Sequence, residues 1–158
     1  MNIYVRTNDN DLLKYLSSQE LDKVRTIEEK LELHPGQHLI MPDILTRDIY
    51  VITEGVVELW TPDCKQQPVV IAVRYEGELI GHLSYITKLP PVLTATAKGL
   101  VKAIKYSEEK LAQLMKNPNI SAKIEAALND SLAEQQIFYT QKLVALGDGG
   151  LDAIRENK

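Results

Sequence analysis

Short segments rich in β-branched and aromatic residues follow one another closely between residues 26 and 106, and turns separate them. Valine, isoleucine, threonine and tyrosine favour strands, whereas glycine, proline, asparagine and aspartate favour turns. The expected strands lie at residues 27–33, 38–41, 48–53, 56–60, 68–75, 94–97 and 100–106. With a further strand end expected before Gly81, this makes about eight short strands, and such spacing is typical of a sandwich or a jelly-roll barrel. We therefore predict a mainly β fold with flanking helices, a jelly-roll-like β-roll of the double-stranded β-helix type.

Two turns in this region are of particular interest. His34-Pro35-Gly36-Gln37 has the composition of a tight turn, with glycine directly after proline. Glu54-Gly55 joins two strongly β-forming segments, and such a dipeptide favours a β-hairpin. We expect the strands on either side of Gly55 to pair with each other.

Helical patterns precede the strands in residues 8–25. Asn8 or Asp9 is expected to cap a first short helix that holds three leucines. Ser17 and Glu20 have the spacing of a capping box, which predicts the start of a second helix. These short N-terminal helices are expected to cover one end of the barrel.

Two more helices are expected after the strands. Ser107 is the predicted N-cap of the first, with two glutamates in its opening turn. Pro118 suits the first turn of a long helix, which Gly147 would end. The expected organisation is one domain over residues 1–146, with N-terminal helices at 8–25, a β-roll at 26–106, C-terminal helices at 107–146 and a flexible tail at 147–158.

The stretch EGELIGHLSYITKLPPVLTATA, residues 76–97, indicates the end of a strand, a glycine turn, a short helix, a proline turn and another strand. The glycines at 77 and 81 permit positive φ and close backbone approach. Free N–H groups at the start of the short helix would point into the turn, an arrangement that suits an anion. The candidate pocket is therefore placed here.

This stretch resembles the phosphate-binding cassette of cyclic-nucleotide-binding domains, the family of cyclic-AMP receptor proteins and kinase regulatory subunits. GHLS at 81–84 and PPVLT at 90–94 occupy the family's frame of glycine turn, short helix and Pro-Arg-Ala/Ser-Ala-Thr. The segment YVITEGVVEL, residues 50–59, and the glycines at 36, 55 and 77 also resemble the family. The resemblance extends over residues 10–145. It implies a β-roll that senses a cyclic nucleotide and regulates a partner.

The cassette departs from the family pattern at positions that matter for binding. The resemblance places the family's ribose-binding glutamate on His82 and its phosphate-pairing arginine on Pro91. Since proline offers no donor where arginine offers a charged planar fork, we expect binding of cAMP or cGMP to be weak or altered. Val92 stands where the family often has a hydroxyl. The candidate ligand-binding residues are Gly81, His82, Leu83, Ser84, Pro91, Val92 and Thr94.

Several of these residues have two interpretations. His82, when protonated, could donate a charge-assisted hydrogen bond to an anion, or it could be a loop histidine paired with a backbone carbonyl. The hydroxyls of Ser84, Thr94 and Thr96 could reach a ligand or satisfy their own backbone. The strand register of Arg74 favours a position outside the pocket or in an ion pair.

The aromatic residues also allow alternatives. Phe138 and Tyr139 lie where the family places residues that stack on the base, but at helical spacing they equally suit a core or a dimer seam. Trp60 is expected to be a sheet residue. The resemblance implies that the helix Pro118–Leu146 is a dimer seam, so a homodimer is the expected assembly.

Composition excludes several classes of function. The net charge is −4, with Lys and Arg scattered, which argues against a nucleic-acid-binding surface. The single cysteine, Cys64, cannot form an internal disulfide and fits a reducing, cytoplasmic compartment. No apolar run approaches membrane-spanning length. The three histidines, His34, His38 and His82, do not have metal-ligand spacing, and no catalytic motif occurs, so we expect neither a metal site nor an enzyme.

The sequence therefore supports two functions of different classes. The first is a regulatory ligand-sensing domain, in which a ligand bound at residues 76–97 shifts the last helix and changes a dimer or a partner's surface. The second is a degenerate β-roll without a ligand, which acts as a dimerisation or protein-interaction module. The only cofactor implied is a cyclic nucleotide, through the family resemblance.

Overall fold

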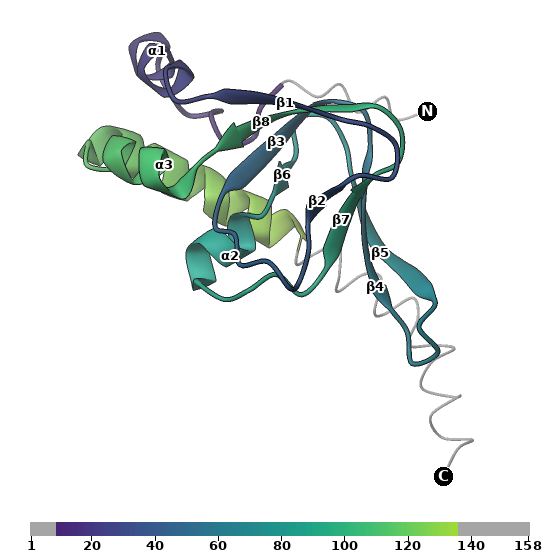
Figure 1. The fold of residues 1–158 in the computed structure, drawn as a ribbon. Helices are drawn as coiled ribbons and strands as arrows, with labels where there is room; N and C mark the ends of the chain where they lie inside the picture. Colours follow the sequence, from purple (N-terminus) through teal and green to yellow (C-terminus); the bar gives the residue numbers. More distant parts are fainter. Residues whose placement is uncertain (1–8, 136–158) are drawn as a thin grey trace, which may run out of the picture.

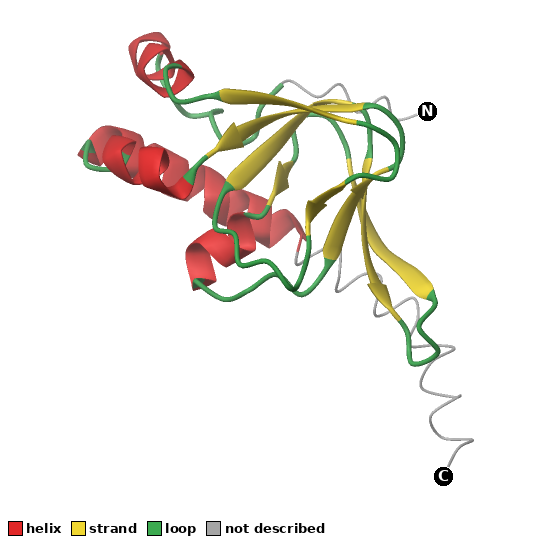
Figure 2. Ribbon diagram, in the orientation of Figure 1, coloured by secondary structure: helices red, strands yellow, loops and turns green. Residues whose placement is uncertain are grey.

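The computed structural model describes residues 9–135, which form two four-stranded antiparallel sheets with helices along one side (Figures 1 and 2). The strands are β1 Glu29–Leu33, β2 His38–Ile40, β3 Ile49–Glu54, β4 Val57–Pro62, β5 Pro68–Arg74, β6 Leu79–Ile80, β7 Thr94–Ala97 and β8 Val101–Tyr106. They are ordered β1-β8-β3-β6 in one sheet and β2-β7-β4-β5 in the other. This arrangement confirms the predicted β-roll with flanking helices.

The strand β3 connects the two halves of the core. Ile49 and Val51 pack on one face with residues of the helices, whereas Tyr50 and Ile52 pack on the other face, inside the roll. Successive side chains of a strand point to opposite faces, so a strand buried on both faces is a continuous apolar run. The segment IYVI has this character, and all four of its residues are buried.

The expected hairpin at Gly55 is wrong. β3 and β4 belong to different sheets, and the chain crosses between the sheets at this glycine. Gly55 has φ of +97°, and a Cβ at this position would lie 2.5 Å from the carbonyl oxygen of Leu100. Only glycine permits both the left-handed conformation and the close approach. The hairpin of this sheet is β4–β5, and it extends away from the helices (Figure 1).

At the N-terminal side, the second expected helix is confirmed and the first is not. The helix α1 Ser18–Arg25 begins with the predicted capping box of Ser17 and Glu20. Residues 9–17 form turns instead of a helix, and the Oδ1 of Asn10 accepts a hydrogen bond from the N–H of Leu12 at 3.0 Å. Leu12 is fully buried in the core all the same. A side chain that satisfies the local backbone, as that of Asn10 does, favours a turn over a helix.

At the C-terminal side, α3 Glu108–Leu114 begins at the predicted cap Ser107. A second helix covers residues 118–135, and the Oδ1 of Asn117 accepts from the N–H of Asn119 at 3.0 Å at its start. Ile120 and Ile124 of this helix pack with α1, α3 and the outer face of β3. The predicted end of this helix at Leu146 and the predicted tail at 147–158 lie outside the described residues.

Candidate functional site

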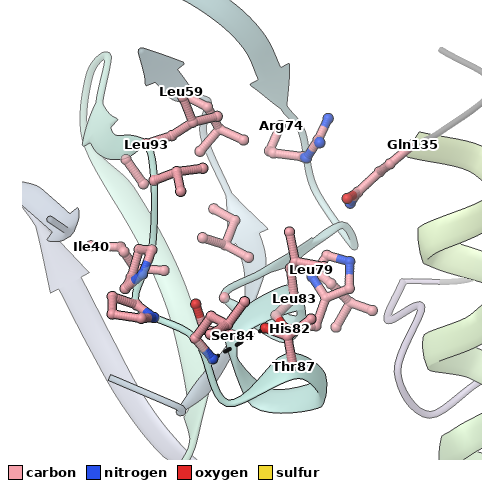
Figure 3. Close-up of a pocket in the computed structure, with 17 residues that line it drawn as sticks. Ile40, Leu59, Arg74, Leu79, His82, Leu83, Ser84, Thr87, Leu93 and Gln135 are labelled. Atoms are coloured by element: carbon pink, nitrogen blue, oxygen red, sulfur yellow. Dashed lines mark hydrogen bonds between the residues drawn. The ribbon is translucent and has the colours of Figure 1, made fainter. Parts of the chain in front are cut away.

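A cavity of about 210 Å³ opens beside the short helix α2 His82–Thr87 (Figure 3). Strand residues form its inner wall, α2 and the turn after it form its rim, and the helix over residues 118–135 reaches it with one side chain. Most of the wall is apolar. The aliphatic strand residues of the wall are Ile40, Leu59, Leu79, Ile80 and Ala95.

The geometry of this region depends on Gly81. Its φ is +87°, and a Cβ there would lie 2.6 Å from the carbonyl oxygen of Asp48. Gly81 is the N-cap of α2, and no side chain caps that helix. Lys88, with φ of +63°, ends the helix and donates its N–H to the carbonyl of Ser84 at 2.9 Å. The expected order of glycine turn, short helix, proline turn and strand is confirmed.

Six of the seven predicted ligand-binding residues line the cavity. They are Gly81, His82, Leu83, Ser84, Pro91 and Val92. Val92 is 74% exposed, and it lies at the rim. The seventh, Thr94, is buried in β7 outside the lining, which β7 reaches through Ala95. The side chain of Thr96 is hydrogen-bonded outside the cavity lining, because its Oγ1 accepts a hydrogen bond from the Nε1 of Trp60 at 2.8 Å.

His82 is the most deeply buried polar residue of the cavity, with 3% of its surface exposed. Its Nε2 lies 3.2 Å from the Oγ of Ser131, and its buried Nδ1 has no hydrogen-bond partner among the described residues. Burial and, second, the nearby positive charge of Arg74 lower the pKa of His82 to about 4, while the amide of Gln135 opposes the shift. The imidazole is therefore neutral at pH 7.

The environment of His82 differs from both interpretations of the sequence. A pKa of about 4 disfavours the protonated donor, and the hydrogen-bond partner is a side-chain hydroxyl of a distant helix instead of a backbone carbonyl. The sequence contained one usable signal. Ser131 follows the buried Ala127 and Leu128 by four and three residues, so it shares their buried helix face.

Arg74 lines the cavity, contrary to the expectation that it lies outside. It is 5% exposed, and its Nη1 lies 4.0 Å from the Oε2 of Glu78, so the expected ion pair is present. The alternation of β5 explains the position, because Ala72 and Arg74 are both buried and share one face of the strand. The sequence shows this alternation, but it does not show which of the two strand faces meets the cavity.

Gln135 is a lining residue that the sequence did not indicate. It comes from the helix over residues 118–135, and it extends toward Arg74 across the edge of the cavity (Figure 3). Its Nε2 donates to the Oγ of Ser131 at 3.5 Å, so Gln135, Ser131 and His82 form a short polar chain. The predicted stacking residues Phe138 and Tyr139 lie outside the described residues.

The chemistry of this arrangement suits binding. A neutral imidazole, a buried hydroxyl and an ion-paired arginine surround an apolar space, and such pockets typically hold small molecules. Within residues 9–135, no group of three or more His, Cys, Asp or Glu side chains is placed to hold a metal ion. In the same range, no helix has the length and apolar character needed to cross a membrane.

Known structures share this fold. The N-terminal domain of a transcriptional regulator from Streptomyces coelicolor A3(2) is 25% identical, with a TM-score of 0.70 over 80% of this chain and 90% of that one. A cyclic nucleotide-binding domain from Methylobacillus flagellatus KT is 18% identical, with a TM-score of 0.77 over 82% and 74%. The regulatory subunit of a cAMP-independent protein kinase A from Trypanosoma brucei is 19% identical, with a TM-score of 0.65 over 84% and 47%, so this chain spans about half of that subunit.

Sequence comparison identifies the family. No curated protein matches the sequence. A family model described as "Cyclic nucleotide-binding domain" matches residues 30–118, which is more than half of the chain. The matched range runs from β1 through α3 and contains the whole cassette. The chain belongs to the cyclic nucleotide-binding domain family.

Proposed function

We propose that this chain is a regulatory ligand-sensing domain that binds cyclic nucleotides weakly or takes another small molecule in their place. One observation supports this most strongly. Among the described residues that line the cavity, Arg74 is the only one with a charged side chain at pH 7, and Glu78 pairs with it at 4.0 Å. Pro91, at the position where the family resemblance places an arginine, contributes no donor.

The missing arginine has a substantial energetic effect. Removing one partner of a desolvated charge-assisted pair typically costs about 2–5 kcal/mol. That range corresponds to a loss of affinity from about thirtyfold to several thousandfold. A cyclic nucleotide bound here would also meet a largely apolar wall and a neutral His82. Tight binding of a phosphodiester is therefore disfavoured.

The contacts of His82 provide a route from the cavity to the rest of the protein. Its Nε2 is next to Ser131, and Gln135 lines the cavity from the same helix. A ligand that moves α2 or Gln135 acts directly on the helix over residues 118–135. It can shift that helix only to the extent that it binds the two positions with different affinity.

Regulation without cAMP is compatible with this fold. The Trypanosoma brucei relative is the regulatory subunit of a kinase described as cAMP-independent. We propose the same kind of role here: a non-enzymatic, cytoplasmic regulator. Assembly as a homodimer through the helix Pro118–Leu146 is part of this proposal, and so is the absence of nucleic-acid binding by this chain alone.

A second function is favoured by one feature of the surface. Leu83, Ile86, Leu89 and Val92 are all at least 40% exposed on α2 and the turn that follows it. Exposed apolar side chains that gather in one region are typical of interaction sites. The alternative is therefore a β-roll without a ligand that serves as a dimerisation or protein-interaction module.

Calorimetric titration of the full chain with cAMP and with cGMP tests the proposal. We expect saturable binding weaker than about 100 µM, which corresponds to a binding free energy of about −5.5 kcal/mol, or binding of a different small molecule in a ligand screen. Low-micromolar binding of either nucleotide would contradict the weak-binding part. A complete lack of small-molecule binding, together with a concentration-dependent dimer in light scattering, would favour the interaction module.

A further inference from the structure

We propose that residues 2–7 of this chain, NIYVRT, add a further strand to the outer edge of β5, and that the side chain of Arg6 faces an acidic pocket at the end of that strand. Residues 2–7 lie outside the described residues, whereas the surface that they would cover belongs to the described part of the chain. The character of the β5 edge, the place where the chain enters the fold and the charge of the pocket support this pairing.

β5 differs from the other edge strands of the two sheets. The edge strands are β1, β6, β2 and β5. β2 and β6 have only three and two residues, and β1 carries Glu29, Lys30 and Glu32. Short length and charge both protect a sheet edge from pairing with another chain. β5 has seven residues, and its run VVIAV at 69–73 contains no charge.

The apolar run of β5 is partly exposed on both faces of the strand. Val69 and Val70 are each 41% exposed, and successive side chains of a strand point to opposite faces. Within residues 9–135, β4 is the only strand that pairs with β5, which lies at the outer side of the β4–β5 hairpin (Figure 1). Because proteins normally cover a long apolar edge, a further strand is expected on the side of β5 that faces away from β4.

The chain enters the fold beside the end of β5. The N–H of Asp11 donates to the carbonyl of Gly77 at 2.9 Å, shortly after β5 ends at Arg74. Pro68 precedes Gly77 by nine residues, and Asn2 precedes Asp11 by the same number. Since an extended chain rises about 3.3 Å per residue, the residues before Asp11 can follow β5 over its whole length. Both segments then run toward the same end, so the pairing is parallel.

The composition of residues 2–7 suits a strand. Ile3, Tyr4 and Val5 are β-branched or aromatic, which favours β-structure. Equal spacing from Asp11 and from Gly77 places Arg6 beside Ala72. The part of β5 that lines the acidic pocket begins at the next residue.

The pocket at this end of β5 has a volume of about 240 Å³, and its charge complements Arg6. The carboxylates of Asp11, Glu78 and Glu134 line it together with the guanidinium of Arg74, so its charge is net negative at pH 7. Arg6 is the only residue among positions 1–10 with a basic side chain. A guanidinium next to carboxylates makes charge-assisted hydrogen bonds. Charge and register therefore place the same residue at the pocket.

The pocket shares two lining residues with the cavity beside α2. Arg74 and Gln135 line both spaces. A segment docked at the pocket therefore lies against two residues that also face the ligand cavity. The pairing itself requires no ligand, so it can be tested separately from the ligand-sensing function.

NMR spectroscopy of the full chain tests the pairing. We expect nuclear Overhauser effects between backbone protons of residues 3–7 and of residues 69–73, and slow hydrogen exchange of the β5 amides that face away from β4. Val5→Pro removes a backbone donor within the segment and should speed exchange of these amides at least about tenfold. Asn2→Pro is the matched control. Because proline is tolerated at the first residue of a strand, its effect should stay below about twofold.

Reversal of charge tests the place of Arg6. Arg6→Glu should speed exchange of the same amides at least about threefold, and the difference from the wild type should shrink as the salt concentration rises. Lys65→Glu changes the net charge equally in the exposed loop between β4 and β5, outside the pocket lining, and should leave the exchange unchanged. Equal effects of the two reversals would overturn the role of Arg6.

The nuclear Overhauser effects are measured on the wild type, so they decide the question even if Val5→Pro does not fold. Their absence, together with fast exchange of the outward β5 amides, would overturn the pairing. A sample that mixes ¹⁵N-labelled and ¹³C-labelled copies identifies the occupant of the edge. Contacts found only between copies would overturn the assignment to the same chain and indicate that two molecules exchange this segment.

Discussion

The Nε2 of His82 lies 3.2 Å from the Oγ of Ser131, and both side chains are buried. This contact joins the first residue of α2 to the helix over residues 118–135, 49 positions later in the chain. Because α2 borders the cavity, the helix is connected to the site by this polar contact and by Gln135 one turn further on.

Ser131→Ala should destabilise the fold. The variant leaves the buried imidazole of His82 without its hydroxyl partner, which should lower the free energy of unfolding by about 1–3 kcal/mol. Urea denaturation followed by circular dichroism measures the change. Ser121→Ala is the matched control in the same helix, since that hydroxyl reaches only the exposed Glu125 at 3.4 Å. Its effect should stay within about 0.5 kcal/mol, and equal losses in the two variants would contradict the role of the buried contact.

Protonation of His82 should destabilise the protein as the pH falls. The pKa of His82 is lowered from 6.5 to about 4 in the folded state, so between these values the unfolded chain binds a proton that the folded chain does not. The contribution of the neutral His82 to the free energy of unfolding is fully present above pH 6.5, and it is lost as the pH falls toward 4. Between pH 7.5 and pH 5 we expect a loss of about 2 kcal/mol. His82→Gln lacks the titrating group, and its stability should change less over that window; an unchanged pH dependence would contradict the assignment.

The loss of stability caused by protonation of His82 can be separated from the loss caused by protonation of carboxylates. Hydrogen bonds from Lys123 and Ser17 lower the pKa of Glu20 from 4.5 to about 2. Its stabilising contribution is therefore present above pH 4.5 and is lost as the pH falls toward 2. Most of this window lies below that of His82, so the two groups can be distinguished in one pH series.

Much of the fold could be predicted from local patterns. The capping box of Ser17 and Glu20, the cap at Ser107 and the strand β7 were identified from composition and spacing alone. The pairing partner of β3 was not, because a glycine after a strand is compatible with a hairpin and with a crossover between sheets. The contact of Gly55 with Leu100, far along the chain, decides between them, and long-range contacts are not visible in local sequence.

The site was predicted less completely, for a related reason. The cassette residues line the cavity because one continuous stretch, 76–97, forms most of it. Arg74 and Gln135 come from other elements, and the sequence does not state which strand face or helix face meets the cassette. The environment of His82 depends on Ser131 in the same way. The protonation state of a histidine that a distant element buries is not visible in local sequence.

Three glycine variants separate backbone strain from steric clash. Gly81 has φ of +87° and a backbone oxygen 2.6 Å from the position of an added Cβ, Gly36 has φ of +84° and open space, and Gly99 has open space without positive φ. Gly99→Ala should be nearly neutral and Gly36→Ala should cost about 1 kcal/mol. Gly81→Ala should cost about 2 kcal/mol or more, because the strand end and α2 must move apart. The midpoint temperatures of thermal unfolding rank the three variants. An equal loss of stability in Gly36→Ala and Gly81→Ala would show that the close approach of Gly81 to Asp48 is unimportant.

Pro91→Arg should restore affinity for a cyclic nucleotide. Pro91 lines the cavity and is half-buried, so an arginine there places a charged planar donor at the wall. A charge-assisted contact with the phosphodiester should tighten the binding of cAMP at least about tenfold, a gain of about 1.4 kcal/mol. Calorimetry of the wild type and the variant measures the difference. Because the new contact is ionic and at the edge of solvent, the gain should shrink as salt concentration rises.

The control for this variant is Pro68→Arg, which adds the same charge at an exposed proline of the β4–β5 hairpin, outside the cavity lining. Equal gains in the two variants would mean that net charge, and not the position of the guanidinium, attracts the nucleotide. No gain at Pro91 would mean that something other than the missing arginine limits binding, and the apolar wall beside Leu59 and Ile80 is the first feature to test. A gain confined to Pro91→Arg would show that the pocket still has the shape for a cyclic phosphate and lacks only the charge.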